Sequence, residues 1–138
     1  METPGAIAKL LRSAAFKTFA SALLTLPYWW SGLTKLADFK VARAEAAGFG
    51  LEPSAVFVAL VIAVQLGGSA LLIVGRWSWL AAGALGVFTA LATLIAHPYW
   101  MIAEPAARFH ALNTFLEHLG LIGGFMVAAA LAETERTA

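Results

Sequence analysis

The chain has 138 residues, of which 61% are hydrophobic and 12% are charged, and its net charge at pH 7 is +1. A soluble domain averages about 45–50% apolar and about 25% charged residues, and a chain this short cannot hide such an excess in a core. The charge provides no basic field for nucleic acid, and the lack of cysteine excludes disulfides, thiolate metal sites, iron–sulfur ligation and a dithiol relay. We expect a single all-α transmembrane domain over residues 1–138.

Four apolar segments are long enough to cross a bilayer, which takes about 20 residues of helix. In chain order they span approximately residues 18–34, 55–74, 79–97 and 112–132. Pro27 has no amide hydrogen for the carbonyl of Leu23, so we expect it to kink the first segment. The short link from Gly75 to Ser78 makes the second and third segments antiparallel neighbours. The pattern predicts an integral membrane antiparallel four-helix bundle with both termini on one side.

The connections place charged and aromatic residues near the membrane surfaces. The longest connection, about Ala37 to Ser54, begins with a helical composition that Gly48 and Gly50 break, and Pro53 starts the next span. Six aromatic residues near the span ends form the expected belt: Trp29, Trp30, Trp77, Trp79, Tyr99 and Trp100. The side with both termini carries five Lys and Arg residues and the other side four, which does not decide the orientation.

Each predicted span carries a stripe of small and polar residues on one helical face. The stripe of the first span is Lys17, Ser21, Thr25, Tyr28, Gly32 and Lys35, and that of the second is Val61, Gln65, Gly68, Ser69 and Leu72. The stripe of the third span is Gly83, Gly86, Ala90, Thr93 and His97, and that of the fourth is His110, Asn113, Glu117, Gly120, Gly124 and Ala128. Membrane helices pack through such residues, because lipid does not reward the burial of leucine. We expect the four stripes to face one axis, with packing as the alternative to binding for the small residues.

Polar side chains gather in the half of the membrane that bears the longest connection. Antiparallel order brings these to a similar depth: Tyr28, Lys35, His97, His110, Asn113 and Glu117, with Gln65 near mid-membrane. Glu117 lies about 10 Å inside its span, where a charge without a partner is costly. We therefore predict one cluster of Tyr28, His97, Asn113 and Glu117 with Lys35 at its rim. The alternative for Glu117 is a neutral carboxyl that bonds a neighbouring helix.

This cluster could serve a quinone, whose headgroup needs hydrogen-bond donors, proton exchange and flat apolar walls. Glu117, His97 and Tyr28 are the candidate catalytic residues. The candidate residues for binding the cofactor are Asn113, Lys35, His110, Gln65 and Trp30. No metal site is predicted. We do not expect a haem, because His97 and His118 fall at different depths and on unlike faces, with His118 turned toward lipid headgroups, a partner subunit or a second copy.

Three motifs resemble the DoxX family of small membrane proteins. Gly32-Leu33-Thr34-Lys35-Leu36-Ala37-Asp38 is similar to the G-x-x-K-L-x-D end of that family's first helix, and Gln65-Leu66-Gly67-Gly68 to its second-helix motif of an acid followed by paired glycines. The segment from Asn113 to Gly124 resembles the family's N-x-x-x-K-x-x-x-x-x-G-G pattern. Gln65 stands in place of the acid and Glu117 in place of the basic residue, so a charge pair between those helices is absent or rewired.

The resemblance implies a bacterial inner-membrane protein with cytoplasmic termini and a periplasmic long connection. It also implies a subunit of a quinone-linked oxidoreductase complex, in contact with other subunits or a second copy. The first alternative is a non-catalytic subunit that assembles or anchors a larger complex, which small-residue stripes fit equally well. The second is a pathway for a small solute or protons, which would need an oligomer because four helices leave little room for a pore.

Overall fold

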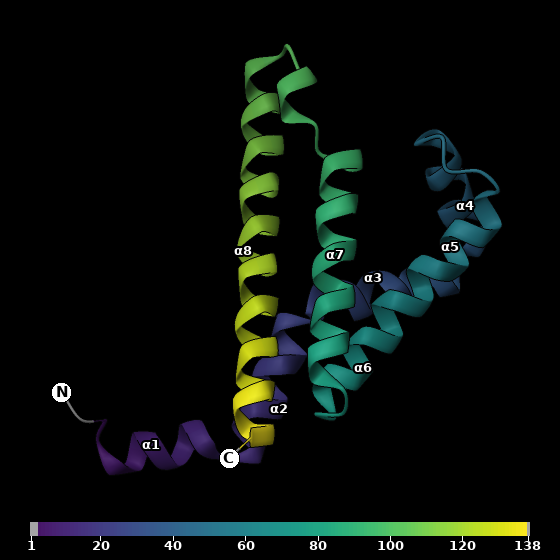
Figure 1. Cartoon of the computed structure of the whole chain (residues 1–138). Coiled ribbons are helices and arrows are strands. Elements are labelled where there is room, and N and C mark those ends of the chain that lie inside the picture. Colours follow the sequence, from purple (N-terminus) through teal and green to yellow (C-terminus); the bar gives the residue numbers. More distant parts are fainter. Residues whose placement is uncertain (1–2, 138) are drawn as a thin grey trace.

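The computed structural model describes residues 3–137, and all regular structure in that range is helical (Figure 1). The α-helices are α1 (Gly5–Arg12), α2 (Ala14–Leu24), α3 (Leu26–Ala37), α4 (Phe39–Gly48), α5 (Ser54–Ile62), α6 (Gly68–Ile73), α7 (Ser78–Ala96) and α8 (Pro105–Thr137). A π-helical turn, Ala63–Gly67, joins α5 to α6, and a 3-10 turn, Tyr99–Met101, follows α7. The all-α prediction is confirmed, as is a helix in the longest connection, which ends near Gly50 with its φ of 74°.

Three helical stretches are long and apolar enough to cross a membrane: Ser54–Ile73, Ser78–Met101 and Pro105–Thr137. They match the second, third and fourth predicted spans. The first predicted span, residues 18–34, is two helices rather than one kinked helix. Thr25 separates α2 from α3 with φ −92° and ψ 0°, because Pro27 in the first turn of α3 cannot continue the hydrogen-bond ladder. Each half is shorter than a full span.

The helices diverge from one end of the molecule. Helices α7 and α8 form an antiparallel hairpin, whereas α5 and α6 lean away from α7 with α3 and α4 beside them (Figure 1). Helix α6 packs against α7, but α5 does not, within the described part of the chain. The main core lies where the helices still meet and consists of Tyr28, Leu72, Ala81, Ala82, Leu85 and Phe125. The divergence leaves room between α5 and α7.

The first two predicted stripes face inward, as expected. Tyr28, Gly32, Gln65 and Gly68 are all buried. A Cβ atom on Gly32 would lie 2.8 Å from Leu66 Cγ, so the backbone of α3 needs a glycine to approach the π-helical turn this closely.

The fourth stripe is correct only in its second half, where a Cβ on Gly124 would lie 2.9 Å from Leu24 Cδ1 and Ala128 packs against the core. In its first half the inward face is displaced by about one residue, or about 100° of helix rotation. Asn113, Glu117 and Gly120 are exposed, and a Cβ on Gly120 would meet only open space. The buried centre of α8 is Phe125, whose ring lies edge-on to Tyr28 at 5.3 Å between centroids. Packing of a large aromatic residue therefore sets the inward face of α8. The third stripe is correct in part: Thr93 is buried and His97 lines a cavity, whereas Gly83 is exposed and Thr89, which was not on the predicted stripe, is buried.

Candidate functional site

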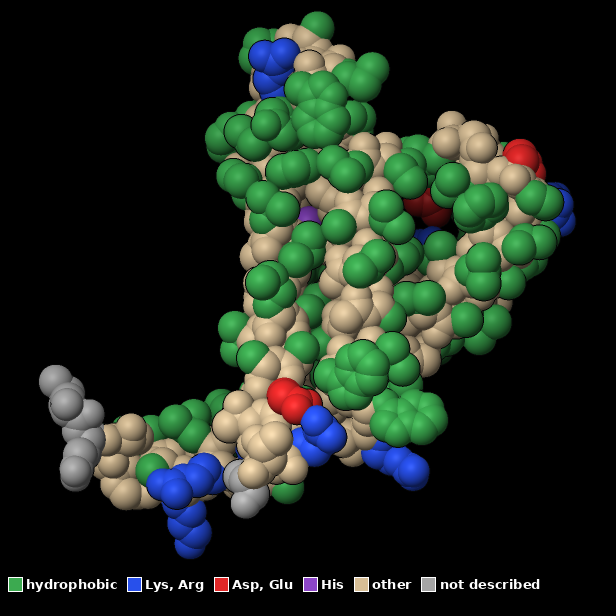
Figure 2. Space-filling model, in the orientation of Figure 1, with side chains coloured by type: hydrophobic (Ala, Val, Ile, Leu, Met, Phe, Trp, Pro, Cys, Tyr) green, Lys and Arg blue, Asp and Glu red, His purple; other side chains and the backbone are tan. Residues whose placement is uncertain are grey.

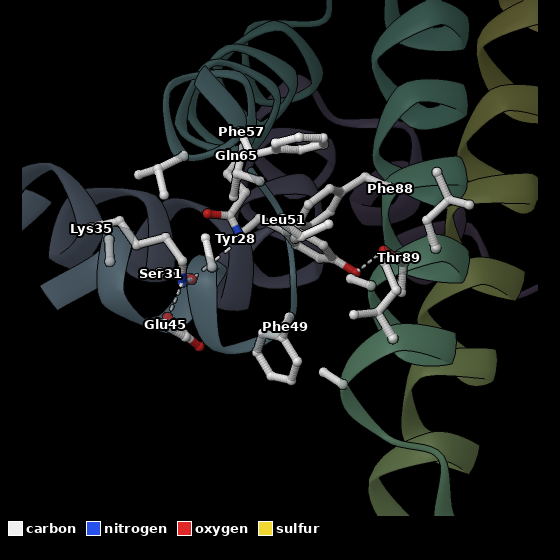
Figure 3. A pocket seen from close by; sticks show the side chains of 18 of the residues that line it. Tyr28, Ser31, Lys35, Glu45, Phe49, Leu51, Phe57, Gln65, Phe88 and Thr89 are labelled. Carbon is white, nitrogen blue, oxygen red and sulfur yellow. Dashed lines mark hydrogen bonds and ion pairs between the residues drawn. The ribbon is translucent and has the colours of Figure 1, made fainter. Parts of the chain in front are cut away.

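A cavity of about 440 Å³ lies where α3, α4 and α5 separate from α7 and α8. Figure 2 shows its opening between α5 and α7, with a carboxylate and a cation visible inside. Its walls are largely apolar and include Phe49, Leu51, Phe57, Phe88, Leu91 and Ile95. Its polar side chains are Tyr28, Ser31, Lys35, Glu45, Gln65 and Thr89, which Figure 3 labels, together with His97 and His118. The volume is in the range of small-molecule pockets.

Ser31 links two polar side chains on the α3 side of the cavity. Lys35 Nζ donates to Ser31 Oγ at 2.8 Å, and Gln65 Nε2 donates to the same oxygen at 3.3 Å (Figure 3). Lys35 Nζ also lies 3.9 Å from a carboxylate oxygen of Glu45 on α4. The positive charge of Lys35 in the cavity is thus balanced by Glu45, which belongs to the longest connection.

The other end of the Gln65 amide has no partner. Gln65 is 5% exposed, and its Oε1 is buried without a hydrogen bond to any residue in the range 3–137. The residue sits at the centre of the π-helical turn, a feature frequent at functional sites. An unsatisfied buried amide group costs about 1–3 kcal/mol. A hydrogen-bond donor that reached this oxygen would remove that cost.

Tyr28 does not present a free hydroxyl to the cavity. Its Oη lies 2.5 Å from Thr89 Oγ1, which in turn bonds the carbonyl of Leu85 at 2.6 Å. Because a carbonyl only accepts, Thr89 donates to Leu85 and Tyr28 donates to Thr89. The tyrosine hydroxyl therefore fastens α3 to α7 in this structure.

Two histidines meet where the C-terminal end of α7 lies against the middle of α8. The His97 and His118 rings are 5.0 Å apart between centroids, and His118 Nδ1 lies 2.7 Å from Thr93 Oγ1. Thr93 donates to the carbonyl of Thr89 at 2.6 Å, so His118 Nδ1 carries a hydrogen and donates to Thr93. The expectation that these histidines lie at different depths and on unlike faces is wrong. The rotation of α8 turns His118 inward in place of Glu117.

The structure brings together only part of the predicted cluster. Tyr28, Lys35, Gln65 and His97 line the cavity. The remaining candidates do not line it: Glu117, Asn113 and His110 are exposed along α8, and Trp30 is 64% exposed. Asn113 and Glu117 therefore do not join Tyr28 and His97.

Sequence reasoning missed four cavity residues: Ser31, Glu45, Thr89 and His118. Two of them had a visible signal, because Ser31 precedes Lys35 by one helical turn and Thr89 precedes Thr93 by one turn, so that each shares a face with a residue of a predicted stripe. Glu45 reaches the cavity only through the fold of α4 onto α5, which no local pattern indicates.

The comparisons with known proteins identify a family. The DoxX family model matches residues 16–98, more than half of the chain, including the Lys35 and Gln65 motifs and excluding α8. No curated relative and no solved structure matches the chain. The α8 motif, from Asn113 to Gly124, therefore lies outside the matched residues. This chain belongs to the DoxX family, whose members are small membrane proteins.

Proposed function

We propose that this chain is the membrane subunit of a quinone-linked oxidoreductase complex, with the quinone headgroup in the cavity between α3 and α7. The observation that carries the proposal is the Gln65 amide, which is buried in the wall of an apolar cavity and has an unpartnered oxygen. Rotating this amide by 180° would leave its NH₂ group unpartnered instead. In either orientation one polar group of the amide is left without a partner in residues 3–137.

The chemistry of the cavity fits a flat ring with oxygen at both ends. Phe49, Phe57 and Phe88 supply aromatic wall area. Lys35 supplies a cationic donor toward one ring oxygen, and Gln65 Oε1 accepts a hydrogen bond from the hydroxyl of the reduced form. The His97–His118 pair lines the same cavity, and imidazole exchanges protons near neutral pH. These residues would bind the ring and move its protons.

The electrons would have to come from another subunit. The chain has no cysteine, and residues 3–137 hold no cluster of three or more metal-ligating side chains. A partner protein that oxidises the substrate is therefore part of the proposal.

The proposed subunit crosses the bacterial inner membrane four times. Helices α2 and α3 together make the first crossing, as a broken span that completes an antiparallel four-helix bundle. Both termini are cytoplasmic, and α4 is periplasmic. A reporter that is active only in the periplasm, fused after Ala138, should be inactive. Activity of that fusion would reverse the orientation and place the cavity mouth nearer the cytoplasm.

The binding proposal is tested by quinone retention. The chain is purified from native membranes in lipid nanodiscs, and bound quinone is extracted and quantified. Gln65→Leu should weaken retention by about two- to tenfold, the loss of one hydrogen bond. Glu117→Gln is the matched control, because Glu117 is exposed and does not line the cavity. Equal retention by wild type, Gln65→Leu and Glu117→Gln would contradict the proposed site.

A second candidate is a non-catalytic subunit that anchors a larger complex. The observation in its favour is the exposed polar face of α8 formed by His110, Asn113 and Glu117. In the 18-residue apolar segment of this helix, only 6% is buried inside the protein. Polar groups at membrane depth favour contact with another helix. Purification with a stoichiometric partner and no quinone would support this candidate over the first.

A further inference from the structure

Helix α1 is strongly amphipathic and has no buried residue. Ile7, Leu10 and Leu11 share one face, at the i, i+3 and i+4 positions, and are between 47% and 55% exposed. Lys9 and Arg12 project from the opposite face, because they are rotated by about 140–200° from Ile7. Such a face, if left in water, would expose a contiguous apolar surface.

The direction of this helix differs from that of the spanning helices. Helix α1 extends sideways from the lower end of the α7–α8 hairpin (Figure 1). Within residues 3–137 it packs against α2 alone. The hydrophobic side chains of α1 lie mainly on the side toward which α7 and α8 extend, whereas its blue cationic side chains point away (Figure 2). The apolar face is thus turned toward the membrane interior.

Aromatic and charged residues place the membrane surface at this level. Trp77 and Trp79 are 68% and 59% exposed, and they line one groove together with Leu11. Exposed tryptophans at the end of a span mark the boundary between hydrocarbon and headgroups. The described residues at this end include five Lys and Arg side chains against two carboxylates: Lys9, Arg12, Lys17, Arg76 and Arg136 against Glu133 and Glu135.

We propose that α1 is an interfacial helix that binds anionic phospholipid headgroups. Ile7, Leu10 and Leu11 insert below the phosphates, and Lys9 and Arg12 contact the phosphates from the water side. Two of the other three cations at this end are already paired, because Lys17 forms a salt bridge with Glu135 and Arg136 with Glu133. This favours Lys9 and Arg12 as the residues that contact the headgroups. The two cations of α1 remain directed at the headgroup layer.

The position of α1 is tested with spin labels on the full-length chain in nanodiscs. The chain has no cysteine, so Leu11→Cys and Lys9→Cys each give a single labelled site on opposite faces. The Leu11→Cys label should collide more with oxygen, which concentrates in hydrocarbon, and the Lys9→Cys label more with a water-soluble nickel chelate. Equal access of the chelate to both labels would show α1 in water. Shelter of the Leu11→Cys label from both reagents would show protein on this face. Either result would overturn the proposal.

The lipid preference is tested by amide exchange in α1. Each cation near an anionic surface contributes about fivefold in binding. Exchange in wild type should be at least fivefold slower in nanodiscs with phosphatidylglycerol than in pure phosphatidylcholine. Lys9→Gln/Arg12→Gln should abolish that difference, whereas the control Lys40→Gln/Arg43→Gln, on α4, should retain it. Equal exchange of wild type in both lipids would refute the binding of anionic headgroups.

Discussion

The close contact between α6 and α7 can be tested by substituting two adjacent glycines, Gly67 and Gly68. Gly67 and Gly68 both have helical backbone angles, so alanine is compatible with either backbone. A Cβ on Gly68 would lie 2.9 Å from Leu85 Cγ and within 3.3 Å of both its methyl carbons. A Cβ on Gly67 would meet nothing within 4 Å. The two substitutions therefore differ in packing but not in chemistry.

The expected magnitude follows from overpacking. Both Gly→Ala changes gain up to about 1 kcal/mol of helix propensity, and only Gly68→Ala forces a methyl group against the fully buried Leu85. Overpacking a core costs about 1–3 kcal/mol. We expect Gly68→Ala to be less stable than Gly67→Ala by about that amount, measured as the free energy of unfolding in mixed detergent micelles.

A double-mutant cycle ties the effect to Leu85. Leu85→Ala alone should cost about 2–5 kcal/mol, and it should cost less in the Gly68→Ala background because the new methyl group fills part of the space. Equal stability of Gly67→Ala and Gly68→Ala, or simple additivity of Gly68→Ala with Leu85→Ala, would refute the close approach of α6 to α7.

Two further predictions concern hydrogen bonds. Thr89→Val leaves the buried Tyr28 hydroxyl without its acceptor and should cost about 1–3 kcal/mol in unfolding free energy; Tyr28→Phe should recover part of this loss, and no recovery would contradict the pairing. Bonds from the backbone N–H groups of Ala107 and Ala106 hold the pKa of the Glu104 carboxyl below its usual range. The cap on α8 should therefore be intact above the ordinary carboxyl pKa and be lost as pH falls through the lowered value. The protection factors of the Ala106 and Ala107 amides, which are corrected for the intrinsic pH dependence of exchange, measure this, and they should not vary with acid pH in Glu104→Gln.

The sequence predicted three of the spans because each is a continuous apolar run bounded by turn residues. It predicted a kink at Pro27 but not a complete break at Thr25. A missing hydrogen bond at proline is visible in the sequence, whereas its effect depends on how α2 and α3 pack. Helix α2 lies against α6 and α8, while α3 lies against the π-helical turn and α5, so the two halves pack against different elements.

The site was predicted correctly where the stripe rule holds and missed where large residues override it. Tyr28, Lys35 and Gln65 lie on stripes of small residues that do face the core. In α8 the stripe is exposed from Asn113 to Gly120 and reaches a helix contact only at Gly124, beside the buried Phe125. A period of 3.6 residues fixes which residues share a face but not which face turns inward. That choice depends on the shapes of the neighbouring helices. His118 therefore faces inward, whereas the sequence predicted that Glu117 would.

The opening between α5 and α7 determines how a ligand reaches the cavity. It lies on the flank of the molecule (Figure 2), so the proposed quinone would arrive by lateral diffusion within the bilayer. Its occupancy would then depend on its mole fraction among the lipids and not on its concentration in water. Acyl chains would compete for the same entrance, which would make lipid composition a determinant of apparent affinity.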